Sequence, residues 1–203
     1  MMVKSFGGWQ KQPNKLNIQG EIENAIKEIT GEENIELIGS GRTDSGVHAL
    51  AQVANFKTES TLPIEKFAIA INSKLKKSIV IKEAEEVDER FHSRYNAKEK
   101  TYRYVINNSK QGTAIYRDLE CHIPMKLDIK EMKKAAKYFE GEHDFKAFKA
   151  SGTSSKSSVR TIYKAEVKED KDRILIEITG NGFLYNMVRI IAGTLVDVGL
   201  RKN

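Results

Sequence analysis

The chain has 203 residues, 39% of them hydrophobic and 31% charged, which allows one or two compact domains and excludes a disordered chain. Its formal charge of +6 and its pI of about 9.2 favour a polyanionic partner, of which nucleic acid is the commonest. No apolar run approaches the roughly 18 residues of a membrane helix, no signal peptide opens the sequence and a single cysteine excludes an internal disulfide, so we expect a cytoplasmic protein with no membrane segment.

Helix and strand patterns alternate through the first half of the chain. Asn17 can cap a helix whose isoleucines repeat at helical spacing until Gly31 ends it. Pro63 begins a second helix with its apolar residues on one face. Strands are predicted over residues 35–39, 47–58 and 78–87. The order of this half is therefore helix–strand–strand–helix–strand.

The second half begins with a strand, KTYRYVI (100–106), that is rich in β-branched and aromatic residues. Asp128 and Glu131 form a capping box before an amphipathic helix that we expect Gly141 to end. Two further strands and a last helix are predicted over residues 159–169, 172–180 and 183–199, with a tight Lys-Asp turn between the strands. The order of this half is strand–helix–strand–strand–helix.

One more strand before the first half and one after the second would turn both into the β-α-β-β-α-β order of the ferredoxin-like, split-βαβ motif. We therefore predict an α+β fold with two such halves: residues 1–90, which lack the first strand of the motif, and residues 98–203, which lack the last. The halves are expected to form a mixed or antiparallel sheet with helices on one face and a catalytic cleft between them.

The stretch SGRTDSGVHA (40–49) places Arg42 and Asp44 two residues apart between glycines. One interpretation is an Asx turn, in which Asp44 bonds its own backbone and Arg42 forms a surface ion pair. The other is a carboxylate that the neighbouring arginine keeps ionised and ready to act as a nucleophile. The residues alone leave both interpretations open.

Arg189 is the only charged residue between Phe183 and Val196, in a predicted helix with an apolar face. A charge in so apolar a helix is costly unless a partner neutralises it. Arg189 therefore either meets an anionic group or lies on the solvent side of the helix, and its polar neighbours allow the second arrangement.

Aromatic and basic residues gather at three further places. Tyr102 and Tyr104 share one face of their predicted strand, where tyrosines are usually core or cross-strand pairs but can also stack on nucleobases. FHSRY (91–95) interleaves aromatic rings with basic side chains, and GTSSKSS (152–158) is a polar loop with one lysine. Such loops are mostly solvated linkers, although in a basic protein they can contact phosphates.

The histidines and Cys121 show none of the close spacings of a zinc site, so we predict no metal site.

GRTDSGVHA, together with FGGWQKQP, the KTYRY strand and GNGFLYNMVRIIAGTL, resembles the tRNA pseudouridine synthase A family, and the matches run in order across nearly the whole chain. The resemblance implies an isomerase that converts uridine to pseudouridine in the anticodon stem-loop of tRNA, uses no cofactor and is a homodimer. It implies that Asp44 is the catalytic aspartate, with Arg42 and Arg189 as its charged neighbours, and that Tyr102 packs against the target base. It also implies RNA contacts from two segments: Phe91, His92, Ser93, Arg94 and Tyr95, and Gly152, Thr153, Ser154, Ser155 and Lys156.

Two routes and two rival functions stay open. The carboxylate of Asp44 could attack C1′ of the ribose or remove a ribose proton to start an elimination. A non-catalytic RNA-binding module would use the same basic surface and aromatic rings, but it gains little from an aspartate that faces phosphates. A small-molecule lyase or isomerase with Asp44 as its base explains the loop but not the positive charge.

Overall fold

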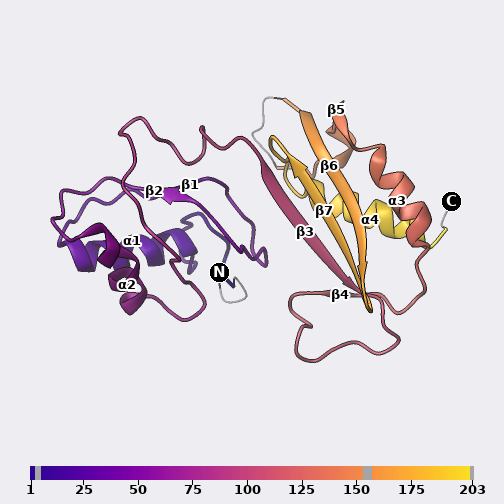
Figure 1. Cartoon of the computed structure of the whole chain (residues 1–203), viewed down its shortest axis with the longest axis horizontal. Coiled ribbons are helices and arrows are strands. Elements are labelled where there is room, and N and C mark those ends of the chain that lie inside the picture. Colours follow the sequence, from indigo (N-terminus) through magenta and orange to yellow (C-terminus); the bar gives the residue numbers. More distant parts are fainter. Residues whose placement is uncertain (3–5, 153–156, 202–203) are drawn as a thin grey trace. The chain divides into compact units, whose positions relative to one another are not determined.

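The computed structural model describes residues 1–2, 6–152 and 157–201, in two compact units, Met1–Ala97 and Lys98–Asn203 (Figure 1). The first unit contains α1 (Ile18–Thr30), β1 (Ile38–Gly39), β2 (Ala54–Asn55) and α2 (Ile64–Lys74). The second contains β3 (Lys100–Asn107), β4 (Cys121–His122), α3 (Ile129–Lys137), β5 (Gly141–Asp144), a 3-10 turn (Lys146–Phe148), β6 (Val159–Asp170), β7 (Arg173–Gly180) and α4 (Met187–Gly199).

The two helices of the first unit are as predicted. The side chain of Asn17 accepts a hydrogen bond from Gly20 N at 2.8 Å, and Gly31 ends α1 with a left-handed φ of 76°. Ile18 and Ile26 of α1 are fully buried in a cluster that also contains Phe67 and Ile71 of α2. Local caps and apolar spacing are enough to specify these helices.

The strands of the first unit are much shorter than predicted. β1 and β2 pair antiparallel over two residues each, and none of residues 78–87 belongs to a strand. Met1 exchanges backbone hydrogen bonds with Ala49, from Met1 N to Ala49 O at 2.7 Å and from Ala49 N to Met1 O at 3.2 Å, and Met2 N donates to Ser78 O at 2.8 Å. A β-strand needs backbone hydrogen bonds to a partner along its whole length. Among the described residues, only Met1 and Met2 make such bonds to the segments at Ala49 and Ser78, so the long strands do not form.

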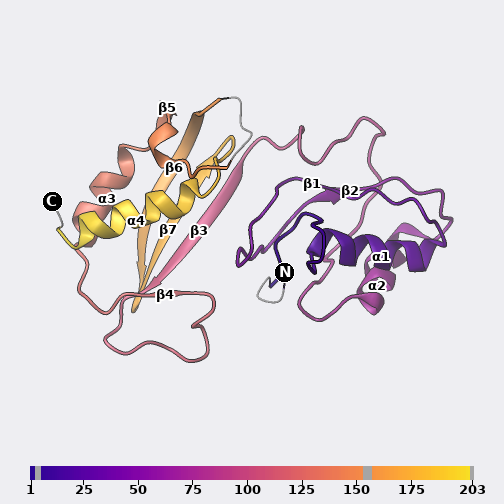
Figure 2. The ribbon, with the colours of Figure 1, turned by 180° about the vertical axis from the view of Figure 1, so that it is seen from behind.

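The second unit contains a mixed five-stranded sheet in the order β4-β3-β7-β6-β5, in which only β3 and β4 run parallel. Helices α3 and α4 cover one face of this sheet, as predicted for it (Figure 2). Tyr104 lies opposite Ile176 and Ile106 opposite Ile174, so this side of β3 and β7 faces the core. The predicted α+β class and helices on one face of the sheet therefore hold for this unit.

Several boundaries in the second unit differ from the prediction. Helix α4 begins at Met187 rather than at residue 183, because Asn186 has a left-handed φ of 57°. Helix α3 ends at Lys137, and Gly141, with φ of 103°, begins β5 instead of ending the helix. The predicted capping box is half formed: Asp128 accepts from Glu131 N, but its own N–H donates to the carbonyl of α4's last residue.

The helix-free face of this sheet carries a row of paired charges. Lys164 and Lys168 contact Glu166 at 2.8 and 2.9 Å, and they hold the pKa of Glu166 at about 2. Lys168 and Arg103 likewise lower the pKa of Glu177. Three cations and two carboxylates pair along this row, which leaves a net charge of +1.

No helix in the described part of the chain has the length and apolar character needed to span a membrane.

Candidate active site

The loop that carries Asp44 is anchored to the segment FGGW (6–9). Gly8 and Asp44 form an isolated antiparallel bridge, Trp9 N donates to Thr43 O at 3.0 Å, and the Ser45 hydroxyl donates to Phe6 O at 3.1 Å. The same segment is also anchored to the start of α1, since Gln19 N donates to Trp9 O at 3.0 Å. Two motifs that lie far apart in the sequence thus form one structural element.

Two glycines make this close packing possible, and a third forms the turn at Asp44. Gly8 has a φ of 110°, and a Cβ there would lie 2.7 Å from Thr43 O. Gly39 packs under Trp9, whose indole ring would be 2.5 Å from an added Cβ. Gly46, with φ of 78°, is the third residue of a turn closed by Val47 N donating to Asp44 O at 3.2 Å. The turn places Asp44 on an exposed corner with its backbone held on both sides.

Arg42 does not pair with Asp44; no ion pair joins these two side chains within the described ranges. The arginine instead lines a pocket of about 250 Å³ together with His92 and Arg94. Trp9 and Gln19 belong to the same wall. The structure therefore brings Arg42 together with the FHSRY segment, which sequence reasoning had assigned separately to RNA contacts.

The FHSRY segment is held by hydrogen bonds to its own residues and to the strands. Ser93 is 3% exposed, donates its hydroxyl to Ile38 O at 2.6 Å and donates its N–H to Asn55 Oδ1 at 2.9 Å. This side chain anchors the segment to β1 and β2 and is not exposed to a ligand. Nδ1 of His92 accepts from both Arg94 N and Tyr95 N at 3.2 Å, and its ring lies 4.1 Å from the Tyr95 ring.

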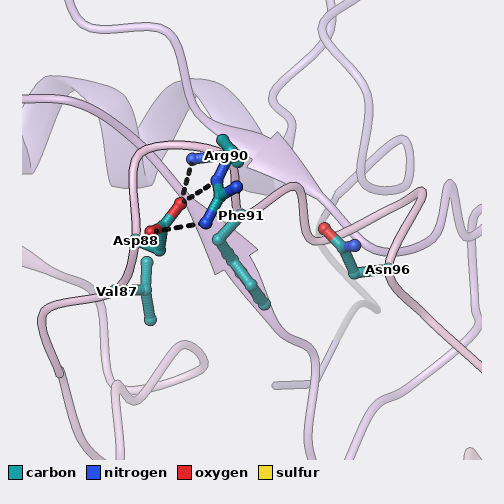
Figure 3. Close-up of a pocket in the computed structure, with 5 residues that line it drawn as sticks. All are labelled: Val87, Asp88, Arg90, Phe91 and Asn96. Atoms are coloured by element: carbon teal, nitrogen blue, oxygen red, sulfur yellow. Dashed lines mark hydrogen bonds and ion pairs between the residues drawn. The ribbon is translucent and has the colours of Figure 1, made fainter.

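A second hollow lies at the start of this segment (Figure 3), with a volume of about 430 Å³ and Phe91 in its lining. Arg90 binds Asp88 through two guanidinium contacts of 2.9 and 3.2 Å, and its own N–H donates to the same carboxylate at 2.9 Å. These hydrogen bonds lower the pKa of Asp88. Arg90 is therefore a neutralised cation, in contrast to Arg94 four residues later.

The predicted residues of the second unit also lie close to one another. The Tyr102 ring packs edge-on against Phe183, with centroids 5.0 Å apart and an angle of 82° between the rings. Burial and a hydrogen bond with Cys121 raise the pKa of Tyr104, and the nearby guanidinium of Arg189 acts in the opposite direction. Arg189, in the first turn of α4, is exposed. The tyrosines of β3, Phe183 and Arg189 thus form one aromatic and basic cluster.

The remaining predicted contact loop is described only at one residue. Gly152 is exposed and has a φ of 87°, whereas Thr153, Ser154, Ser155 and Lys156 lie outside the described residues. Over the described ranges, no group of three or more His, Cys, Asp or Glu side chains is arranged to hold a metal ion.

Sequence reasoning missed two residues that shape these sites. Glu23 of α1 is 1% exposed, accepts hydrogen bonds from Leu37 N at 3.0 Å and from Gln19 Nε2 at 3.2 Å, and pairs with Lys11. Its position between Ile22 and Ile26 on the buried face was the available signal. Phe183 had no such signal, because its contact with Tyr102 depends on the return of the chain after β7.

The chain is thus a basic α+β protein that presents a carboxylate on a fixed turn, an arginine-lined pocket and exposed aromatic rings. Basic and aromatic groups of this kind suit a ligand that is polyanionic and contains bases.

Comparison with known proteins gives the family. Residues 4–96 and 135–203 match the family model described as tRNA pseudouridine synthase. The tRNA pseudouridine synthase A of Caldicellulosiruptor saccharolyticus is 55% identical over 198 residues, which cover 98% of this chain and 81% of that protein. The enzyme of the same name from Acetivibrio thermocellus is 52% identical over the same shares of the two chains. The chain belongs to the tRNA pseudouridine synthase family, a family of isomerases that act on uridine in tRNA.

Proposed function

We propose that this chain converts uridine to pseudouridine in the anticodon stem-loop of tRNA, with Asp44 as the acting carboxylate. The observation that carries the proposal is the fixed turn at Asp44, held by Gly8 and by the Ser45 hydroxyl. An ordinary surface Asx turn needs no such anchoring to another segment, whereas a reacting carboxylate must be held in one position. The family and the names of the relatives give the substrate.

The reaction needs three steps on the same nucleotide. The bond between N1 of uracil and C1′ of the ribose breaks, the base turns over, and C5 bonds to C1′; C5 then loses its proton and N1 gains one. In the nucleophilic route, Asp44 attacks C1′ as uracil leaves, and the attack of C5 releases the carboxylate again. In the elimination route, Asp44 removes a ribose proton. An exposed carboxylate on an anchored turn serves either route.

The second unit supplies the groups that receive the base. A uridine must leave its stack before it can react, which costs a few kcal/mol. The Tyr102 ring, steadied by its edge-on contact with Phe183, offers a surface for the extruded uracil. Arg189 offers a positive charge near these rings, and Arg42 offers one two residues from Asp44.

The ferredoxin-like plan and the homodimer belong to the same proposal. In the second unit, the order β3-β7-β6 with α3 and α4 on one face is the 1-3-2 strand order of a split-βαβ motif. In the first unit, Met1 and Met2 bridge the segments at Ala49 and Ser78, where the first strand of such a motif would lie. Contacts to tRNA from Phe91, His92, Arg94 and Tyr95, and from residues 152–156, follow from the resemblance.

Chemical mapping of the product tests the proposal. An unmodified tRNA transcript is incubated with the protein, treated with a carbodiimide that stays attached to pseudouridine, and read by primer extension. We expect new stops at one or more uridines of the anticodon arm, which disappear from a transcript in which those uridines are cytidines. Stops only outside the anticodon arm would contradict the proposed target. Salt-sensitive binding with no stop anywhere would favour the RNA-binding module instead.

A further inference from the structure

Glu23 is a buried carboxylate for which the reaction has no direct use. It lies on the apolar face of α1 with 1% of its surface exposed, and the other buried residues of this helix are isoleucines and an alanine. Burial of a carboxylate costs free energy that an apolar side chain of similar size does not. In some proteins, such a charge fixes one arrangement of its neighbours rather than adding stability.

The carboxylate of Glu23 joins α1 to two other segments. Its Oε1 accepts from Leu37 N at 3.0 Å and from Gln19 Nε2 at 3.2 Å, and its Oε2 pairs with the ammonium of Lys11. Among the described residues, no hydrogen bond of regular geometry reaches Oε2, so the ammonium is its partner. Lys11 closely follows the segment FGGW, and Leu37 directly precedes β1. The carboxylate therefore links the segment that anchors Asp44 to the strand that leads into its turn.

Gln19 reinforces the same link with its backbone and its side chain. Its Oε1 accepts from Lys11 N at 3.2 Å, and its Nε2 donates to Leu37 O at 3.0 Å. Its own N–H donates to Trp9 O at 3.0 Å, and Trp9 N donates to Thr43 O, directly before the proposed catalytic aspartate. A continuous set of contacts therefore runs from the buried carboxylate to the turn.

We propose that Glu23 is a positioning residue for the reaction. Its carboxylate holds β1 and residues 6–11 in a fixed arrangement, and this arrangement sets where the turn places Asp44. The inference rests on the proposed function for the role of Asp44. Glu23 is buried and does not touch the substrate; it acts through the groups that it holds. A displacement of about 1 Å at a reacting group can cost up to about a hundredfold in rate.

Glu23→Gln keeps the shape of the side chain but cannot satisfy the same partners. With the amide oxygen toward Leu37 N, the NH₂ group meets the Lys11 ammonium. With the amide reversed, the NH₂ group meets the N–H of Leu37 and the Nε2 of Gln19. Two donors face each other in either orientation, and the exposed Lys11 side chain then turns to solvent. The substitution should therefore loosen the link between β1 and residues 6–11.

Single-turnover kinetics and amide hydrogen exchange test the proposal together. With the protein in saturating excess over a tRNA transcript labelled with tritium at C5 of uridine, the rate constant of release reports only folded, bound molecules. Glu23→Gln should lower this rate constant at least about tenfold and leave the dissociation constant of the tRNA within about twofold. The amides of Trp9 and Val47, which donate to the Asp44 loop, should exchange at least about tenfold faster.

Ile26→Val is the matched control. Ile26 is fully buried in the same helix, and the substitution removes one methyl group from the core but none of the hydrogen bonds of Glu23. It should keep the wild-type rate constant, and any faster exchange that comes from lower global stability appears in it as well. Gln19→Met removes side-chain hydrogen bonds of the same link at a half-buried position. It should change both measurements in the same direction as Glu23→Gln, and it serves as the test if Glu23→Gln does not fold.

Each outcome decides the proposal. Wild-type rate constants in Glu23→Gln and Gln19→Met, or an equal loss in Ile26→Val, would overturn it. A lower rate constant with unchanged amide exchange would also overturn it, because the effect would then not pass through the Asp44 turn. If the wild type releases no tritium, the proposed function fails, and the amide exchange still decides whether Glu23 holds the turn.

Discussion

Substitution of Gly8 by alanine tests whether the segment 6–9 sets the position of Asp44. The backbone at Gly8 has a φ of 110°, and the new Cβ would lie 2.7 Å from the carbonyl oxygen of Thr43. Strain at such a positive φ costs about 2 kcal/mol, and the steric overlap about 2 kcal/mol more. The sum, about 4 kcal/mol, is below the stability of a typical domain. We therefore expect a folded variant in which the Asp44 turn has moved.

Gly31→Ala is the matched control. Gly31 also has a positive φ, 76°, but no atom lies within 4 Å of an added Cβ. The free energy of unfolding of Gly31→Ala should fall only by the backbone strain, about 1 to 2 kcal/mol. Its turnover rate should stay at the wild-type value. The only tryptophan, Trp9, is 3% exposed beside the site, so its fluorescence during urea unfolding reports the stability of the first unit.

Activity then separates a structural effect from a positioning effect. A displacement of about 1 Å at a reacting group can cost up to about a hundredfold in rate, so Gly8→Ala should lower the rate of pseudouridine formation at least tenfold under conditions where it is folded. If Gly8→Ala and Gly31→Ala turn over equally fast, the anchoring of Asp44 by this segment is not needed for catalysis.

Three further substitutions address the second unit. Tyr102→Phe should keep the edge-on contact with Phe183 and most of the turnover, whereas Tyr102→Ala should lose about 1 to 3 kcal/mol of base stacking; equal rates for the two variants would exclude stacking at this position. Arg189→Met should lower the turnover rate with little change in melting temperature, because Arg189 is exposed, and an unchanged rate would leave this arginine without a part in the reaction. Two lysines hold the pKa of Glu166 at about 2, below its usual 4.5, so the ionised carboxylate stabilises the fold above pH 4.5 and this contribution is lost as the pH falls through about 2. Glu166→Gln should therefore unfold at a lower urea concentration than the wild type at pH 7, and a difference that persists unchanged to pH 2 would contradict the assigned pairs.

Helices were predictable because their signals are local. Asn17 caps α1 within three residues of its bonding partner, and Gly31 ends it. The strands of the first unit depend on partners from elsewhere in the chain. Alternation along residues 78–87 does not show which backbone lies beside them, and in the structure Ser78 O accepts from Met2 N. The prediction of long strands was therefore wrong.

In the candidate site, too, the local motif could be predicted from the sequence and the long-range contacts could not. The motif around Asp44 was recognisable from the sequence, but its anchoring to Gly8 joins residues 36 positions apart. The pocket joins Arg42 to residues more than 45 positions later, and nothing in the local pattern separates Ser93, which is buried, from the exposed Tyr95. Side-chain roles within a motif depend on tertiary contacts that the motif itself does not encode.

Tritium release tests the central assignment most directly. A tRNA transcript labelled with tritium at C5 of uridine is incubated with the wild-type protein and with Asp44→Asn, and tRNA binding by both is measured in parallel. C5 loses its hydrogen only after the new bond to C1′ forms, so the released tritium reports the reaction itself. We expect release by the wild type, none by Asp44→Asn, and dissociation constants within a few-fold of each other. Release at the wild-type rate by Asp44→Asn would contradict the assignment of Asp44 as the acting carboxylate.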